Sequence, residues 1–222
     1  MVFYFEARGG LMLYMGKDKF ENEHLIKHGW PEDVWFHVDN LSSAHVYLRL
    51  PIGPLRKKFR ETGNLDHIAE AVEDCVALVK ANSIEGCKKT TVDVVYTEWE
   101  NLKKTGDMAD GQVGFHDSKK VIKVKDVPKH REIVNRLNKT KKEEHPDLAA
   151  QRAERDARVA KLRRERAKAQ AKKDAQEKAR MQAEKEARDY KHLFNEDDMM
   201  TNENLGATED TSAAVDFEEG FM

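Results

Sequence analysis

The chain has 222 residues, which leaves room for one ordinary domain with a long extension or for two small domains, and excludes a large multidomain enzyme. Its 39 basic and 41 acidic side chains nearly cancel, but they are unevenly distributed. The net charge is -2 over residues 1–127, +9 over residues 128–192 and -9 over residues 193–222. A basic middle followed by an acidic end indicates a polyanionic partner and a segment able to compete with it.

Most aromatic side chains lie early in the chain, because all 3 Trp and six of the 9 Phe precede residue 116. We therefore expect the hydrophobic core in residues 1–127. Cys75 and Cys87 have no partners at zinc-binding spacing and are typical of reduced thiols. No uncharged apolar run approaches the roughly 20 residues of a spanning helix, and no signal-peptide pattern opens the chain. These features predict a cytoplasmic or nuclear protein, and they indicate no metal or other cofactor.

The first fifty residues predict four strands and one helix. Short β-favouring runs over residues 2–7 and 11–15 flank a Gly-Gly pair, which is typical of a hairpin. A helix is expected over residues 17–29. Residues 33–39 and 44–50 then alternate apolar and polar side chains, which predicts two neighbouring, half-buried strands. The expected apolar face of the helix consists of Phe20, Leu25 and Ile26.

The next part of the chain predicts a connection, a long helix and two more strands. Residues 51–63 carry two prolines and two glycines around a basic centre, so we expect an exposed connection. A helix capped by Asn64 should follow, and residues 90–97 and 121–127 are β-favouring runs. These elements predict one small α+β domain over residues 1–127, with a mostly antiparallel sheet and packed helices. The buried face of the long helix should hold Leu65, Ile68, Ala69, Val72, Cys75, Val76 and Val79.

Residues 128–192 are dominated by strong helix formers and predict a basic helical extension. Pro146 should end or kink a first helix, and a second should run to about residue 192. Alanines recur every four residues over 167–187 and drift around the helix, so we favour a lone helix and a monomer over a coiled coil. Pairing of residues 148–192 with another protein's helix remains an alternative. The acidic tail, residues 193–222, is expected to be disordered and is a candidate competitor for the basic helix.

His37 and His45 are the candidate reactive side chains of the predicted strands. Both lie one residue out of the apolar register, so both imidazoles are expected on one exposed face with Trp35. Spacing places no third metal ligand beside them, and we expect no metal site and no catalytic residues. Contact with a nucleic acid or another partner is the favoured interpretation, and an enzyme acting on RNA through the two histidines is a rival.

Basic and aromatic side chains are the candidate nucleic-acid contacts. Lysines bind phosphates as point charges, and neighbouring Asn or Ser side chains donate hydrogen bonds to phosphate oxygens. Trp35, Tyr47, Tyr96 and Trp99 are candidate stacking surfaces for bases. The basic helix is the stronger electrostatic feature. The predicted contacts are Lys17, Lys19, Trp35, His37, Ser43, His45, Lys80, Asn82, Lys103, Lys104, Arg163, Arg164 and Arg166.

Together, several segments of this sequence resemble the coiled-coil-domain-containing protein 25 family, whose globular part is an NFACT-R domain. The resemblance covers nearly all of residues 1–192, and no single motif would suffice for it. It implies an α+β RNA-binding module, found also in large ribosome quality-control factors. The matching segments are KDKFENEHLIK, WPEDVWFHVDNLSSAHVYLRL, ALVKANSIEGCK, VDVVYTEWENLKK and GQVGFH.

The resemblance also assigns positions. It places the family's acidic-aromatic-histidine strand at Asp33, Trp35, Phe36 and His37, its second histidine motif at Ser43–Val46, its helix end at Lys80 and Ser83, and its lysine pair at Lys103 and Lys104. We expect a non-enzymatic nucleic-acid-binding protein that contacts ribosomal RNA or tRNA, associates with the ribosome and serves translation quality control. DNA binding and a helix-mediated protein adaptor are the alternatives.

Overall fold

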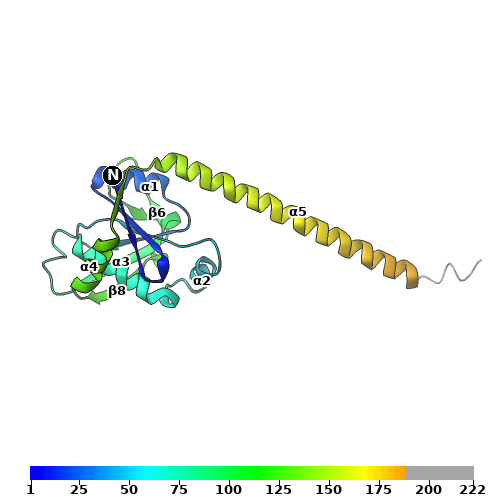
Figure 1. Cartoon of the computed structure of the whole chain (residues 1–222), viewed down its shortest axis with the longest axis horizontal. Coiled ribbons are helices and arrows are strands. Elements are labelled where there is room, and N and C mark those ends of the chain that lie inside the picture. Colours follow the sequence, from blue (N-terminus) through cyan, green and yellow to red (C-terminus); the bar gives the residue numbers. More distant parts are fainter. Residues whose placement is uncertain (189–222) are drawn as a thin grey trace, which may run out of the picture. The chain divides into compact units, whose positions relative to one another are not determined.

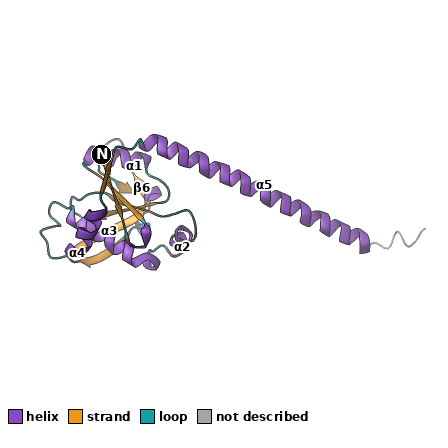
Figure 2. Cartoon of the chain, viewed as in Figure 1, coloured by secondary structure: helices purple, strands orange, loops and turns teal. Residues whose placement is uncertain are grey.

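The computed structural model describes residues 1–188, so the acidic tail and its expected disorder lie outside the described residues. Two compact units divide the chain, the first covering Met1–Val159 and the second beginning at Ala160. Figure 1 follows the elements along the chain, and Figure 2 distinguishes helices from strands. The helices are α1 (Lys19–His28), α2 (Pro54–Thr62), α3 (Ala69–Ala81), α4 (Arg131–Thr140) and α5 (Leu148–Arg188).

The first unit is built on a seven-stranded antiparallel sheet in the order β8-β5-β3-β4-β2-β1-β9, which confirms the predicted α+β fold. A second sheet pairs β6 (Leu102–Lys103) with β7 (Gly114–Phe115). The predicted hairpin and the predicted neighbouring strands are both present, as β1 with β2 and β3 with β4. The strands of the large sheet are β1 (Val2–Glu6), β2 (Met12–Gly16), β3 (Asp33–Val38), β4 (Val46–Arg49), β5 (Val92–Glu98), β8 (Ile122–Val127) and β9 (Lys142–Glu144).

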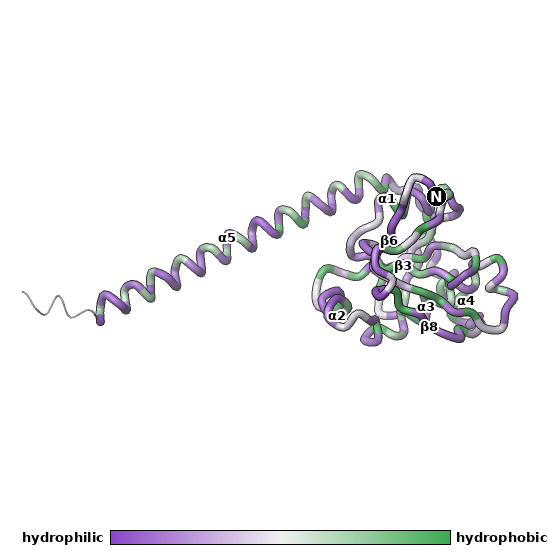
Figure 3. Tube along the Cα trace, turned by 180° about the vertical axis from the view of Figure 1, so that it is seen from behind, coloured by the Kyte–Doolittle hydropathy of each residue, from purple (hydrophilic) through white to green (hydrophobic). Residues whose placement is uncertain are grey.

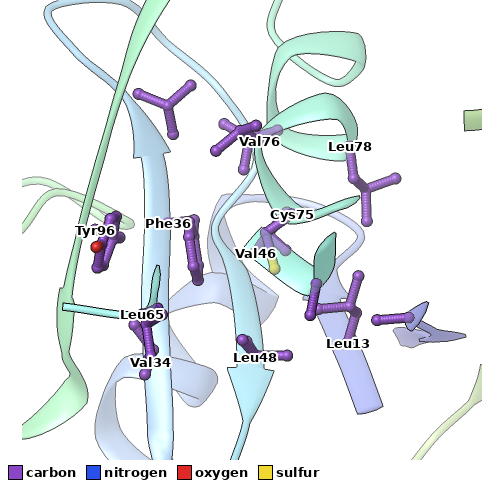
Figure 4. Close-up of a cluster of buried hydrophobic side chains, with 14 of the residues drawn as sticks. Leu13, Val34, Phe36, Val46, Leu48, Leu65, Cys75, Val76, Leu78 and Tyr96 are labelled. Atoms are coloured by element: carbon purple, nitrogen blue, oxygen red, sulfur yellow. The ribbon is translucent and has the colours of Figure 1, made fainter. Parts of the chain in front are cut away.

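The main hydrophobic core lies between one face of the large sheet and helices α3 and α4. Figure 4 shows sheet side chains such as Phe36 and Leu48 near Cys75 and Val76 of α3. The expected buried face of the long helix is confirmed for Leu65, Cys75, Val76 and Val79, all at most 4% exposed. Ile68 and Val72 are only partly buried, and Ala69 is exposed, so the prediction is wrong for Ala69. Asn64 is not its N-cap, because a 3-10 turn over Asp66–Ile68 precedes α3, which begins at Ala69 without a side-chain cap.

The opposite face of the sheet is also covered, contrary to the expectation of half-buried strands. Trp35 and Tyr47 point to this side and form a second buried cluster with Leu25 of α1, against which Phe115 of β7 packs. Helix α1 is present as predicted, but Phe20 lies outside its buried face and is 59% exposed. The alternation of apolar and polar residues along β3 and β4 correctly predicted which side chains share each face of the sheet. It did not indicate that the small β6–β7 sheet covers the face with Trp35 and Tyr47.

Within residues 51–63, Pro54–Thr62 form helix α2 where an exposed connection was expected. Pro54 occupies the first turn of α2, where the backbone N–H that proline lacks would have no partner within the helix. Gly63 ends the helix with a positive φ of 73°, and its N–H donates a hydrogen bond to Phe59 O. Phe59 is 4% exposed and joins the main core. The basic residues of α2 are partly neutralised, since Arg56 pairs with Glu32, and Arg60 pairs with Glu98 at the end of β5 and with Glu100. Burial of Phe59 therefore packs this basic helix against the main hydrophobic core.

The first compact unit continues past the expected boundary at residue 127. Helix α4 buries Leu137 completely, and β9 adds a strand to the sheet by pairing Lys142 with Tyr4. The first predicted helix thus ends at Thr140, and Pro146 lies between β9 and α5 instead of kinking a continuous helix. The amino-acid composition did not predict that α4 and β9 belong to the first unit, because both elements expose mostly charged side chains and contribute only a few apolar ones to the core.

Helix α5 is a single helix of 41 residues, about 62 Å long at 1.5 Å per residue. Figure 3 shows hydrophilic and hydrophobic residues alternating along it. Its two large apolar side chains beyond the first unit, Leu162 and Met181, are 42% and 60% exposed. In the described part of the chain, residues 160–188 therefore contribute nothing to a hydrophobic core.

Candidate nucleic-acid interface

The predicted histidines meet in a cleft of about 450 Å³ over the second face of the sheet. The ring centroid of Trp35 lies 5.3 Å from that of His37 and 5.3 Å from that of His45, and the centroids of the two imidazoles are 5.1 Å apart. The shared face is therefore confirmed, but its expected exposure is wrong. Trp35 is 2% and His45 4% exposed, because residues 110–115 lie over them as the cleft's outer wall.

Burial keeps both imidazoles neutral at physiological pH. It lowers the pKa of His45 from 6.5 to about 3, and the neighbouring His37 adds to the shift. Burial also lowers the pKa of His37, whose Nδ1 lies 2.7 Å from Val38 O. Because a carbonyl only accepts, this contact places the proton on Nδ1 and leaves Nε2 of His37 as an acceptor. The cleft therefore presents hydrogen-bonding groups without positive charge from histidine.

The buried neutral His45 predicts loss of stability in acid. Since its pKa is about 3 in the folded chain and near 6.5 in the unfolded chain, the unfolded chain binds more protons as pH falls through that window. The free energy of unfolding should then fall by about 1 kcal/mol for each pH unit, and a His45→Gln variant should lack this contribution. Urea unfolding of both proteins between pH 6.5 and 4.5 measures the difference. Parallel pH profiles would contradict the burial of a neutral ring.

Asp33, the acidic residue of the motif, is a buried structural anchor. It is 0% exposed and accepts hydrogen bonds from Trp30 N at 2.7 Å, Arg49 Nε at 2.8 Å and the Tyr14 hydroxyl. Burial, together with the Asp33 carboxylate, raises the pKa of Tyr14. The Arg49 guanidinium also lies over the Trp30 ring, 3.6 Å from its centroid. Asp33 thus fixes the start of β3, which carries Trp35 and His37.

The end of α3 positions the loop that carries His45. Ser83 Oγ donates to Ser42 O at 2.7 Å, and Ala44 N donates to Asn82 O at 3.2 Å. Ser43 Oγ accepts from Val38 N at 3.0 Å. Asn82 and Ser43 therefore hold this loop between β3 and β4 through contacts within the protein.

Two of the predicted lysine contacts are used inside the fold. Lys80 is 2% exposed, and its Nζ donates to Thr90 O at 2.7 Å and Val127 O at 2.9 Å, so its ammonium group is not available to a phosphate in this fold. Lys104 Nζ lies 2.8 Å from a Glu23 carboxylate oxygen and donates to the carbonyls of Ala109 and Gln112, which fixes the loop over the cleft. Lys17, Lys19 and Lys103 are exposed.

Three of the four aromatic residues expected as stacking surfaces are buried in this fold. Trp35, Tyr47 and Tyr96 are at most 3% exposed, so none offers an open ring face at the surface. Trp99 is only partly buried, but its Nε1 donates to Ile26 O and the Arg152 guanidinium lies 5.0 Å from its ring centroid. The sequence pattern identified aromatic side chains without showing which of them the second layer of structure covers.

A basic groove of about 750 Å³ in the first unit was missed by the sequence analysis. Residues remote in sequence meet there, because β9 brings the end of α4 beside β1 and the first turns of α5 also line the groove. Some of its cations are already paired, Arg49 with Asp33 and Arg155 with Glu32. The groove is lined by Arg49, Lys139, Lys141, Lys142, Arg155 and Arg158, together with Glu6, Glu144 and Glu154.

The basic stretch of α5 in the second unit presents mostly unpaired cations. Residues 160–188 contain eleven Lys or Arg and five Asp or Glu, a net charge of +6. Arg163, Arg164 and Arg166 are exposed. Within this described stretch, the one ion pair joins Arg188 to Glu184 at 2.7 Å. The remaining cations are therefore available to an external polyanion.

No group of three His, Cys, Asp or Glu side chains among residues 1–188 is placed to hold a metal ion. No helix in the same range is both long and apolar enough to cross a membrane.

Comparison with known proteins identifies the first unit. A family model described as the NFACT protein RNA binding domain matches residues 1–117. Coiled-coil domain-containing protein 25 of Mus musculus is 49% identical over 208 residues, which cover 92% of this chain and 96% of the relative. The Danio rerio protein of the same name is 56% identical over 70% of this chain and 73% of its own length, and a Dictyostelium discoideum homolog is 53% identical over 70% and 72%. The chain therefore belongs to the coiled-coil domain-containing protein 25 family and carries an NFACT RNA-binding domain.

Proposed function

We propose that this chain is a non-catalytic RNA-binding protein that contacts ribosomal RNA or tRNA, associates with ribosomes in the cytoplasm and serves translation quality control. The observation that carries the proposal is the series of exposed, unpaired cations along residues 160–188. Such a series suits the regularly spaced phosphates of a nucleic acid. Membership of a family described by RNA binding favours RNA over DNA as the polyanion.

Salt dependence of RNA binding tests this proposal. If binding neutralises about six to ten phosphates, the affinity for tRNA or a ribosomal RNA fragment should fall on the order of a thousandfold or more between 50 and 200 mM salt. Fluorescence anisotropy of the full chain with labelled RNA measures this dependence, and a DNA of equal length and structure serves as the comparison. Absence of binding to any RNA at 50 mM salt would end the proposal, and equal affinity for DNA would remove the preference for RNA.

A protein adaptor is the second candidate, favoured by the length of α5 and the alanines along it. An adaptor's helix would pair with a partner's helix through apolar contacts, and such pairing does not weaken steeply with salt. The salt series therefore separates the two functions, and crosslinking followed by sequencing of the bound RNA would identify the target if RNA is bound.

A further inference from the structure

Buried polar atoms in the histidine cleft have no partner within the protein. Trp35 Nε1 and His45 Nδ1 are both buried without a hydrogen bond among the described residues, and both side chains line the cleft. Trp35 and His45 are more than nine-tenths buried. An unpaired buried donor or acceptor costs free energy, so these atoms indicate a site for a ligand that supplies hydrogen bonds.

The charges of the cleft do not suit a phosphate. Its charged lining residues are Lys19, Asp39 and Asp110, and both histidines are neutral. Asp39 is paired with Lys123, whereas Asp110 makes no ion pair with any residue of the described chain. Because Lys123 neutralises Asp39, the remaining charges of Lys19 and Asp110 balance, and the cleft has no net positive charge with which to bind an anion. The ligand expected here is uncharged.

The walls of the cleft are aromatic and planar. His37 is stacked on Trp35 with an interplanar angle of 7°, and Phe115 meets Trp35 edge to face at 5.8 Å between centroids. A volume of about 450 Å³ lies within the usual range of small-molecule sites. Flat aromatic groups beside a few hydrogen-bonding atoms are the features with which proteins hold an unstacked base.

We propose that the cleft binds one unstacked nucleobase of a single-stranded or looped RNA, with Trp35 Nε1 and His45 Nδ1 as hydrogen-bonding partners and His37 beside the base. This inference rests on the proposed RNA-binding function and adds a distinct site to it. Phosphates would be bound by the basic helix, and the cleft would select RNA whose bases are not paired.

Uncharged nucleosides test the cleft without the basic helix. The indole N–H signals of the 3 Trp residues can be followed by NMR in the full chain, with the Trp35 signal assigned by its absence in a Trp35→Phe variant. Adenosine, guanosine, cytidine or uridine should shift the Trp35 signal, and inorganic phosphate should not. Trp99 is an internal control, because its Nε1 is already bonded to Ile26 O. No shift with any nucleoside, or an equal shift with phosphate, would overturn the proposal.

A variant that fills the cleft tests its contribution to RNA binding. Ser42 is exposed and lines the cleft, so Ser42→Trp should obstruct it without disturbing the core. We expect about a tenfold or greater loss of affinity for single-stranded RNA and no change for duplex RNA, since only an unpaired base can enter the cleft. Ser118→Trp, at an exposed site outside the cleft, is the matched control. Equal affinities of both variants for single-stranded RNA would discard the base site while leaving salt-dependent RNA binding intact.

Discussion

Reversing the charges of Arg163, Arg164 and Arg166 to glutamate is expected to weaken RNA binding by about two orders of magnitude or more at moderate salt. All three side chains are exposed and form no ion pair within the described chain. Glutamate is as good a helix former as arginine, so the helix should persist. The slope of log affinity against log salt should also fall by roughly 2 to 3, because three phosphate contacts are lost.

A variant with the same change in net charge provides the control. Lys119, Lys120 and Lys125 are exposed in the first unit and can be reversed to glutamate together. If the helix binds RNA directly, this control should lose much less affinity than the arginine variant. Equal losses of RNA affinity in the two variants would show that only the overall charge matters. Unchanged RNA binding by the arginine variant would show that α5 does not bind RNA. Circular dichroism of both variants checks that helix content is retained.

Asp33→Ala is expected to reduce the free energy of unfolding by about 3–5 kcal/mol. The substitution leaves the guanidinium of Arg49, whose side chain is 18% exposed, without its carboxylate partner. It also removes the acceptor of the Tyr14 hydroxyl and of Trp30 N. Urea unfolding at neutral pH, monitored by circular dichroism, measures the loss.

Two further variants separate this cost from a general effect of removing a carboxylate. Glu61→Ala breaks the exposed pair with Lys57, 3.6 Å apart, and should change stability by less than about 1 kcal/mol. Replacing Asp33 and Arg49 together by Ala and Met should recover part of the loss, because no unpaired charge then remains. A loss below about 1 kcal/mol for Asp33→Ala alone would show that the buried pair contributes little.

Local patterns in the sequence were sufficient to predict most strands and their faces. The alternation through Val34, Phe36 and Val38 reflects a core that extends along β3, so neighbouring residues carry the information. The helical content of residues 51–63 was missed because it depends on the burial of Phe59 against residues distant in sequence. Likewise, β9 exists through its pairing with β1, and its short charged sequence has no strand pattern of its own.

The candidate site was predicted in part. Pairing of β3 with β4 follows from their patterns, and it brings His37, His45 and Trp35 together as expected. Their burial was not predictable, because the cover comes from β7 and the loop before it, whose polar sequence resembles an exposed connection. The basic groove was also missed, since its lining joins Arg49 to residues about a hundred positions later.

The two outer strands of the large sheet have a consequence for copies crowded on one RNA molecule. The outermost strands are β8 and β9, and each presents charged side chains, Lys123, Lys125 and Asp126 on one and Lys142, Glu143 and Glu144 on the other. Charged edges discourage the backbone pairing through which neighbouring sheets fuse into aggregates. Many molecules gathered on a long polyanion should therefore remain separate bodies, able to dissociate one at a time.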